Sequence, residues 1–212
     1  SVAKNTIETE SEAIKNLATL IDQSFTDAVE YIYNSNGRVI ITGIGKSAII
    51  ANKIVATLNS TGTPSIFMHA ADAIHGDLGT ILEQDVVICI SKSGTTPEIK
   101  VLVPLIKVRG NKLVAITSNS DSFLGQQADF ILNAFVEKEA CPNNLAPTTS
   151  TTAQLVIGDA LAVCLLDLRG FSSKDFAKFH PGGSLGKKLY LRVSDLTKIN
   201  KKPVVQLDTD IK

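Results

Sequence analysis

Two short loops contain most of the residues whose chemistry stands out in this chain. They read Thr42-Gly-Ile-Gly-Lys-Ser47 and Ser91-Lys-Ser-Gly-Thr-Thr96. Each follows an apolar run typical of a buried strand and precedes a stretch typical of a helix. Hydroxyl groups and the backbone N–H groups of a helix N-terminus bind anions together. The pattern therefore indicates a phosphate site. Its predicted hydroxyl donors are Ser47, Ser91, Ser93 and Thr96.

Neither loop is a nucleotide-binding motif. The P-loop pattern G-x-x-x-x-G-K-[ST] does not occur here. The first loop has the G-x-G of a dinucleotide fingerprint, but its third glycine is not in register and no acidic residue clearly ends the second strand. One compact phosphate suits two hydroxyl-rich loops better. A Ser/Thr/Gly turn can also be only a helix cap, and that alternative stays open at this point.

A sugar-phosphate isomerase needs few further groups. The phosphate anchors the substrate, a carboxylate removes a proton beside a carbonyl, and an acid or cation stabilises the oxygen. The chain offers Glu98 and Glu139 as carboxylates and Lys46 inside the first loop. Its histidines are His69, His75 and His180. Such a reaction requires no redox cofactor, and two histidines six residues apart are a weak metal signal.

Each of these residues also has a purely structural interpretation. Glu98 stands where a helix dipole favours a carboxylate in the first turn. Glu139 lies in a charged stretch that is typical of a solvated surface. Lys46 is equally consistent with an exposed loop lysine, and His180 with the end of a helix. The residues alone leave these alternatives open.

The elements that would position these loops follow from the hydrophobic pattern. Short apolar runs occur at Val39–Ile41, Ser65–Met68, Val86–Ile90, Leu113–Thr117 and Phe130–Leu132. Helical stretches such as Ala48–Leu58 and Glu98–Val108 alternate with them, and a long apolar helix is predicted over Ala153–Leu168. Alternation of this kind predicts a doubly wound, flavodoxin-like α/β fold with a parallel sheet and helices on both faces. Ligands bind at the carboxyl ends of such strands.

Composition narrows the class of protein. The 212 residues carry 21 basic and 21 acidic side chains, and this balance argues against non-specific nucleic-acid binding. No apolar run reaches the roughly 18 residues expected of a membrane helix, and no signal-peptide pattern opens the chain. Cys89 and Cys164 lie in apolar runs, so buried free thiols are expected. We therefore expect a cytoplasmic protein without membrane or nucleic-acid partners.

A set of ordered motifs resembles the D-arabinose 5-phosphate isomerases, which are sugar isomerase (SIS) domain proteins. The match runs from about residue 35 to about residue 195. Its most specific blocks are Lys138-Glu-Ala-Cys-Pro142 and His180-Pro-Gly-Gly183. Further blocks are Gly43-Ile-Gly-Lys-Ser47, Ser60-Thr-Gly-Thr-Pro64, Ala73-Ile-His-Gly-Asp-Leu-Gly79, Ser91-Lys-Ser-Gly94, Leu145-Ala-Pro-Thr-Thr-Ser-Thr-Thr152 and Gly158-Asp-Ala160.

The resemblance implies a function and an assembly. Members interconvert D-ribulose 5-phosphate and D-arabinose 5-phosphate, and the aldose feeds synthesis of Kdo for lipopolysaccharide or capsule. A five-stranded parallel sheet flanked by helices and a homotetramer with shared active sites are implied as well. A downstream Kdo nucleotide sugar is an expected inhibitor. The runner-up interpretations are another SIS phosphosugar isomerase and a non-catalytic sugar-phosphate or nucleotide-sugar sensor.

The resemblance also assigns roles to residues. Those implied to be catalytic are Lys46, Glu98, Glu139 and His180. Those implied to line the substrate site, besides the phosphate donors, are Gly62, Thr63, His69 and His75. A zinc ion is associated with the position of His69. We expect Glu139 to be the base, with a pKa raised by burial in an irregular loop, and Glu98 to be more acidic.

The chain departs from the family pattern in two places. Lys92 replaces a smaller or neutral residue of many relatives, and Thr95-Thr-Pro97 replaces a Glu/Ser-rich variant. Longer members carry CBS domains after the sugar domain, so a short form without them is expected. The predicted organisation is a helical segment over residues 1–34, an SIS domain over 35–195 and a polar tail over 196–212.

Overall fold

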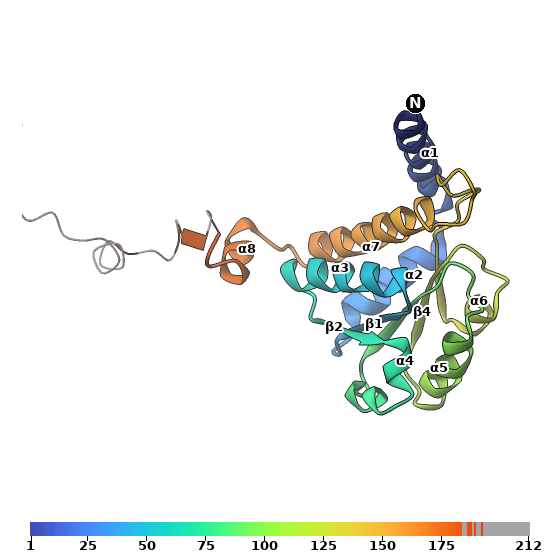
Figure 1. Ribbon diagram of the computed structural model, residues 1–212. Helices are drawn as coiled ribbons and strands as arrows, with labels where there is room; N and C mark the ends of the chain where they lie inside the picture. The colour runs from blue at the N-terminus through green and yellow to red at the C-terminus, as the bar shows by residue number, and fades with distance from the viewer. Residues whose placement is uncertain (184–185, 188, 190–191, 193–212) are drawn as a thin grey trace, which may run out of the picture. The chain divides into compact units, whose positions relative to one another are not determined.

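The computed structural model describes residues 1–183, 186–187, 189 and 192. The chain divides into two compact units, Ser1–Phe171 and Ser172–Lys212. The first unit contains a parallel sheet of five strands in the order β2-β1-β3-β4-β5 (Figure 1). The predicted doubly wound fold and the number of strands are confirmed.

The strands fall where the apolar runs predict them, within about two residues. They are β1 (Val39–Gly43), β2 (Ser65–His69), β3 (Val86–Ile90), β4 (Leu113–Thr117) and β5 (Phe130–Asn133). Three of them, β1, β3 and β4, are buried along their whole length, as expected of central strands covered on both faces. Gly43 pairs with Ile90 in the register of β1 and β3. The two hydroxyl-rich loops therefore leave the sheet side by side.

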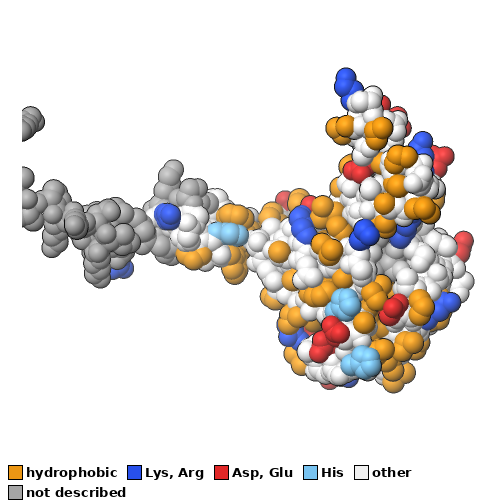
Figure 2. Space-filling view, in the orientation of Figure 1, with side chains coloured by type: hydrophobic (Ala, Val, Ile, Leu, Met, Phe, Trp, Pro, Cys, Tyr) orange, Lys and Arg blue, Asp and Glu red, His pale blue; other side chains and the backbone are white. Residues whose placement is uncertain are grey.

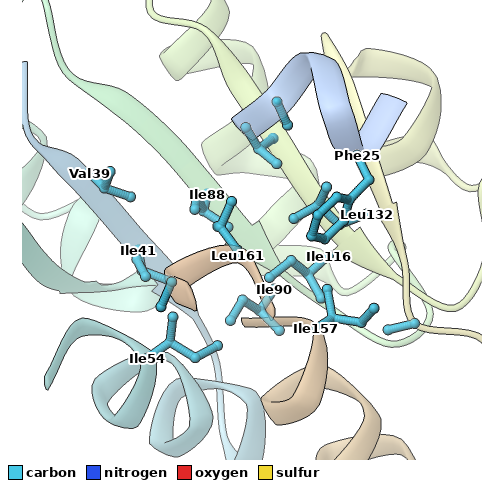
Figure 3. Close-up of a cluster of buried hydrophobic side chains, with 14 of the residues drawn as sticks. Phe25, Val39, Ile41, Ile54, Ile88, Ile90, Ile116, Leu132, Ile157 and Leu161 are labelled. Atoms are coloured by element: carbon cyan, nitrogen blue, oxygen red, sulfur yellow. The ribbon is translucent and has the colours of Figure 1, made fainter. Parts of the chain in front are cut away.

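Helices cover both faces of the sheet because alternate strand residues are apolar on both sides. One face packs against α2 (Gln23–Asn34), α3 (Lys46–Ser60) and α7 (Thr149–Leu168). Figure 3 shows this core, where Ile41 and Ile88 of the sheet lie near side chains of α3 and α7. The other face, which includes Ile40 and Val87, packs against α4, α5 and α6. Those helices span Ala70–Ala73, Pro97–Val108 and Phe123–Gln127.

The N-terminal segment, predicted to be helical over residues 1–34, is not one continuous helix. It forms α1 (Val2–Leu17), a 3₁₀ turn η1 (Ala18–Leu20) and α2. Asp22 starts α2 because its side chain accepts a hydrogen bond from the Phe25 backbone N–H at 3.2 Å. Asp22 was therefore the sequence signal for a new helix, and the apolar periodicity alone did not reveal it. A second 3₁₀ turn, η2 (Asp77–Thr80), precedes β3.

The expectation that no segment is apolar enough to span a membrane is wrong for helix α7. By length and composition alone, Thr149–Leu168 could cross one. Its buried residues, among them Ile157, Leu161 and Leu165, instead join the core that it shares with α2, α3 and the sheet. Core packing thus accounts for its apolar sequence.

The cysteines are free thiols, as predicted. Cys89 is fully buried in β3, and burial raises the pKa of its thiol to about 12. Cys164 is only half-buried against the core, so it is less covered than its apolar run suggests.

The second unit begins with α8 (Ser173–Phe179). A capping box starts this helix, in which Ser172 and Asp175 bond to each other's backbone N–H. His180 caps its C-terminus, and its ring stacks on that of Phe176 at 3.9 Å between centroids. The predicted domain boundary at residue 195 and the polar tail lie outside the described residues.

Candidate active site

A cavity of about 310 Å³ opens at the carboxyl ends of β1 and β3. Its lining comes from the loop after β1, the loop after β3 and the first turns of α7. The four predicted phosphate donors and Lys46 all line it, together with Ile44, Ile90, Lys92, Pro147, Ser150, Thr151 and Gln154. The structure therefore brings five of the predicted site residues into one pocket.

The hydroxyls of this pocket differ in how they are engaged. Ser91 Oγ accepts a hydrogen bond from Gly94 N at 3.1 Å and so holds the loop in shape. Ser93 Oγ does the same for Thr95 N at 3.3 Å, and Ser47 Oγ donates to Gln154 Oε1 at 3.2 Å. Thr96 Oγ1 is buried and has no hydrogen-bond partner within the described part of the chain. That hydroxyl is ready to donate to a ligand.

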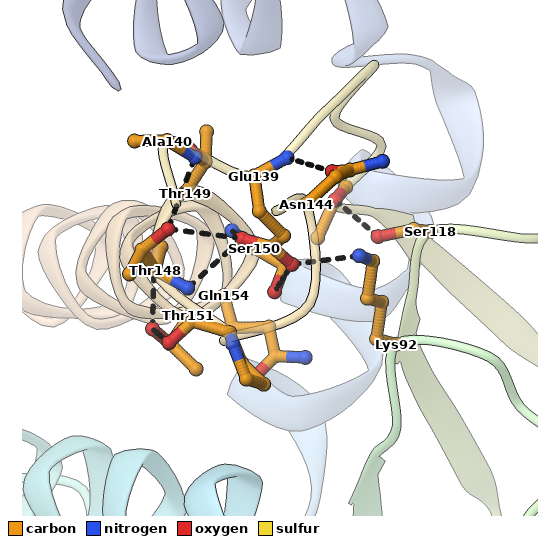
Figure 4. A network of polar contacts seen from close by, with 12 residues as sticks. Lys92, Ser118, Glu139, Ala140, Asn144, Thr148, Thr149, Ser150, Thr151 and Gln154 are labelled. Carbon is orange, nitrogen blue, oxygen red and sulfur yellow. Dashed lines mark hydrogen bonds and ion pairs between the residues drawn. The ribbon is translucent and has the colours of Figure 1, made fainter. Parts of the chain in front are cut away.

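Glu139 lies directly behind the wall of the cavity. Two cavity-lining side chains bond its Oε1, Lys92 Nζ at 2.6 Å and Ser150 Oγ at 2.5 Å (Figure 4). Its other oxygen, Oε2, accepts from Thr148 N at 2.9 Å and Ser150 N at 3.1 Å. The carboxylate is thus held in a fixed orientation with one oxygen toward the cavity.

The electrostatics of Glu139 contradict the raised pKa expected from sequence. Burial alone raises its pKa, and only 4% of the residue is exposed. Hydrogen bonds from Lys92, Ser150 and Thr148 outweigh the burial and lower the pKa to about 2. The expectation was correct that Glu139 is desolvated. It was wrong about the direction of the pKa shift, because it did not include these hydrogen-bond donors. The burial also excludes the solvated-surface interpretation.

The same contacts cap the start of α7. The N-cap residue Thr148 makes no side-chain capping bond of its own. Glu139 supplies the acceptor instead, bonding the Thr148 and Ser150 backbone N–H groups. The loop between them is tied down as well, since Asn144 Oδ1 accepts from Glu139 N at 2.7 Å.

Sequence reasoning missed the residues that surround this carboxylate. Lys92 was noticed only as a departure from the family pattern, and Ser150 only within the motif Leu145–Thr152. Gln154, one turn further along α7, was not singled out at all. The available signal was the position of Lys92 between the two loop serines, which places an ammonium group at the predicted phosphate site.

Glu98 occupies the second position of α5, where it is half-buried. Thr96 is the N-cap of that helix and Pro97 its first residue. Glu98 is not among the described residues that line the cavity. The structure thus places it two residues after Thr96, which lines the cavity.

Gly62 and Thr63 lie elsewhere in the first unit. They precede β2, at the amino edge of the sheet, whereas the cavity is at the carboxyl edge. Five residues of strand separate the two edges by roughly 16 Å. Thr63 is buried, and its Oγ1 accepts from Arg169 Nε at the end of α7. The structure does not bring these two residues to this cavity.

His69 and His75 flank α4 at the carboxyl edge but do not line the cavity. His69 Nδ1 lies 3.5 Å from Asp72 Oδ2, and His75 is exposed. Figure 2 shows histidine side chains at the surface beside acidic ones. The described residues contain no group of three or more His, Cys, Asp or Glu that could hold a metal ion. A zinc ion at His69 therefore stays a prediction.

His180 belongs to the second unit, which is described by itself. Its Nδ1 contacts the Phe176 carbonyl oxygen at 2.9 Å. This contact fits the helix-end interpretation and leaves Nε2 as the ring nitrogen for other contacts. Its catalytic role stays a prediction.

Fold and site together define a doubly wound α/β protein with a pocket lined by hydroxyl and lysine side chains beyond β1 and β3. Residues 31–164 match the SIS domain family, and the chain belongs to that family.

Curated relatives have one recurring name. The chain is 49% identical over 210 residues to the arabinose 5-phosphate isomerase KdsD of Pseudomonas aeruginosa, covering 99% of this chain and 64% of the relative. It is 51% identical over 193 residues to KdsD of Salmonella typhi, covering 91% of this chain and 59% of the relative. The chain thus spans somewhat less than two thirds of the length of these relatives.

A solved structure supports the same grouping. The c3406 protein of Escherichia coli CFT073, in complex with arabinose 5-phosphate, superimposes with a TM-score of 0.82 at 40% identity. The match covers 84% of this chain and 95% of that one. The fold of the present chain is therefore that of a protein with this sugar phosphate bound.

Proposed function

We propose that this chain is an aldose–ketose isomerase that interconverts D-ribulose 5-phosphate and D-arabinose 5-phosphate. The observation that carries the proposal is the pocket itself, where two hydroxyl-bearing loops meet a fixed, desolvated carboxylate. The names of the relatives and the arabinose 5-phosphate complex of the c3406 protein support the choice of substrate.

The hydroxyls and helix N-termini of the pocket bind the phosphate. Thr96 donates its free hydroxyl, and the N-terminal amides of α3 and α5 add to the positive potential. The phosphate fixes the sugar so that its reacting carbons lie toward α7. Binding energy from the non-reacting end thereby positions the reacting end.

Glu139 is the base in this proposal. Its Oε1 takes the proton from C2 of the aldose, and the C–H electron pair forms the C1–C2 double bond of a cis-enediolate while the carbonyl pair moves to O1. The O2 hydroxyl passes its proton to O1, the C2=O2 carbonyl forms, and the C1–C2 double-bond pair takes the proton back from Glu139 at C1, which gives the ketose. Lys46, at the first position of α3, stabilises the negative oxygen, and Glu98 orients hydroxyls. The reaction is balanced without a redox cofactor.

An isomerase assay with two aldoses tests the proposal. The chain should convert ribulose 5-phosphate to arabinose 5-phosphate and leave ribose 5-phosphate largely unused. Turnover of another phosphosugar would indicate a different SIS isomerase. Tight phosphosugar binding with no turnover would indicate a sensor, and either result would contradict the assignment.

The assembly is part of the proposal. A homotetramer with shared sites would let His180, Gly62 and Thr63 act at a cavity of another subunit. The geometry of Gly62 and Thr63, remote from the cavity of their own chain, supports this arrangement. A zinc ion at His69 would likewise need ligands from outside the described residues of one chain. Mass measurement in solution and metal analysis test both points.

We further propose a cytoplasmic enzyme that supplies Kdo synthesis for lipopolysaccharide or capsule. A downstream Kdo nucleotide sugar would inhibit it by entering the same pocket, where Lys46 and Lys92 suit a sugar acid. Inhibition should then be competitive with ribulose 5-phosphate. Absent or non-competitive inhibition would contradict this regulation.

A further inference from the structure

The two oxygens of Glu139 have different surroundings. Oε2 is anchored by the backbone N–H groups of Thr148 and Ser150 and by Thr148 Oγ1 at 3.3 Å. Oε1 is covered by two side chains that line the cavity, Lys92 and Ser150. Glu139 itself is not among the lining residues. A sugar in the cavity therefore meets Lys92 and Ser150 before it meets Oε1.

Of the two partners in the ion pair, the lysine is free to move. The Glu139 side chain is 2% exposed, and its other hydrogen bonds come from Thr148 and Ser150. The Lys92 side chain is 44% exposed. Its backbone is fixed, because Lys92 O accepts from Ser118 N at 3.1 Å and from Thr117 Oγ1 at 3.2 Å. Only the flexible stem and the ammonium group can change position.

Lys92 also lies between the two serines of the phosphate loop. Ser91 and Ser93 line the same cavity, so a phosphate held there comes close to the lysine stem. A phosphate carries a charge of about −1.5 to −2 near neutral pH, more than the single charge of a carboxylate. Phosphate is thus a strong competitor for the ammonium group.

We propose that Lys92 changes partner on substrate binding: it pairs with Glu139 before the sugar binds and turns to the phosphate afterwards, which opens Oε1 to the reacting carbon. This inference rests on the proposed function. Lys92 is then a positioning residue that couples phosphate binding to the readiness of the base.

The coupling has an electrostatic consequence. Among the described residues, Lys92 is the charged side chain in contact with this carboxylate, and the other donors are hydroxyl and amide groups. Burial raises the pKa of Glu139, and the hydrogen bond from Lys92 lowers it. When the ammonium group leaves, this lowering contribution is lost and the pKa of Glu139 rises. Phosphate binding thereby converts a weak base into a stronger one.

Carbon NMR of the intact protein with ¹³C-carboxyl-labelled glutamate tests the exchange without turnover. Loss of one signal in Glu139→Gln assigns Glu139, and inorganic phosphate serves as the probe. In the wild type without phosphate, the signal should stay that of a carboxylate throughout the pH range in which the protein is folded. Saturating phosphate should raise the pKa of Glu139 by about one to three.

Three variants complete the design. Lys92→Met should show the raised pKa of Glu139 without phosphate, and Lys92→Arg should behave more like the wild type. Lys53→Met removes another half-exposed lysine that pairs with a carboxylate on α7, Asp159, and should leave the Glu139 signal unchanged. A Glu139 signal in Lys92→Met that matches the wild type would overturn the proposal.

The outcomes separate this inference from the proposed function. If phosphate binds, as seen by ³¹P line broadening, and leaves Glu139 of the wild type unmoved, Lys92 stays paired and only the inference fails. If phosphate does not bind, the phosphate site fails and the inference fails with it. In kinetics, Lys92→Met should raise KM. In the wild type, the fall of kcat at acidic pH should occur at a higher pH than the fall of kcat/KM, because the base has a higher pKa in the substrate complex than in the free enzyme. In Lys92→Met the two falls should occur at the same pH.

Discussion

Two lysine–carboxylate pairs lie at α7, and both have short contacts. Lys92 meets one oxygen of Glu139 at 2.6 Å beside the N-terminus of the helix, and Lys53 of α3 meets both oxygens of Asp159 in its middle at 2.5 Å and 2.7 Å. The two lysine side chains are 44% and 46% exposed. The carboxylates differ sharply, at 2% for Glu139 and 40% for Asp159.

This difference teaches where an ion pair has chemical consequences. Asp159 can exchange its lysine for water at little cost, as is usual for pairs at a surface. Glu139 cannot replace its lysine with water in the same way, because it is buried and its remaining partners are helix amides and hydroxyls. The orientation of a buried carboxylate is fixed and its basicity depends on each contact. Reactivity is therefore expected at the first pair and not at the second.

The largest expected effect is on turnover. Glu139→Gln should lower kcat by about 10²–10⁴-fold, with substrate binding largely retained, because it removes a general base. Asp159→Asn is the matched control and should keep kcat within a factor of about two, since its carboxylate is 40% exposed and does not line the cavity. Steady-state kinetics on both variants checks the contrast. Equal losses would show that the two pairs are both structural.

The next effect is on stability at low pH. The folded-state pKa of Glu139, about 2, lies below its ordinary value of 4.5. The unfolded chain therefore takes up the proton first as pH falls. The stabilisation is present above about pH 4.5 and is lost as pH falls toward 2, with a magnitude on the order of 3 kcal/mol.

Urea unfolding of the wild type and of Glu139→Gln across that pH window measures this term. Asp85 and Asp129, whose pKa values are also lowered, are present in both proteins and cancel in the difference. The wild type should lose stability more steeply than the variant. Parallel pH profiles would show that Glu139 is not held as a low-pKa carboxylate.

A smaller effect is expected at the free hydroxyl of the pocket. Thr96→Val keeps the shape of the side chain and removes the Oγ1 donor, so KM should rise about 10- to 100-fold for a hydrogen bond lost to a charged phosphate. Stability should not fall, because that hydroxyl has no partner in the described chain. Ser91→Ala is the informative contrast, since it also removes the bond to Gly94 N and loosens the loop. An unchanged KM in Thr96→Val would remove Thr96 from the phosphate site.

The smallest effect is expected at the exposed pair. Lys53→Met should change the free energy of unfolding by less than about 1 kcal/mol and leave kinetics unaltered. Chemical denaturation of Lys53→Met and Lys92→Met compares the free energies of unfolding that the two ion pairs contribute. A large loss of stability in Lys53→Met would contradict the view that this pair is dispensable.

The fold was predictable because, along most of the chain, the spacing of apolar residues in the sequence matches the residues that are buried in the structure. Runs such as Val86–Ile90 are short and apolar at every position, which is typical of a strand covered on both faces. The break at Asp22 was missed because the apolar stripe of α1 continues into the next helix with little change of period. A single capping side chain decided the boundary there.

The site was predictable only in part, for a physical reason. Ser47 and Thr96 follow strands whose register is set by the sheet, so their convergence followed from topology. The environment of Glu139 depends on a contact between residues 92 and 139, and no local pattern encodes that pair. The sign of its pKa change depended on that contact and was therefore predicted wrongly.

Solvent hydrogen exchange tests the central claim, that Glu139 moves the proton, most directly. Arabinose 5-phosphate is incubated with the wild type, Glu139→Gln and Glu98→Gln in deuterated water, and deuterium at C2 is followed by NMR. The account predicts exchange with the wild type, retained but slower exchange with Glu98→Gln, and none with Glu139→Gln. Near-normal exchange with Glu139→Gln, together with its loss in Glu98→Gln, would contradict the account and transfer the base role to Glu98.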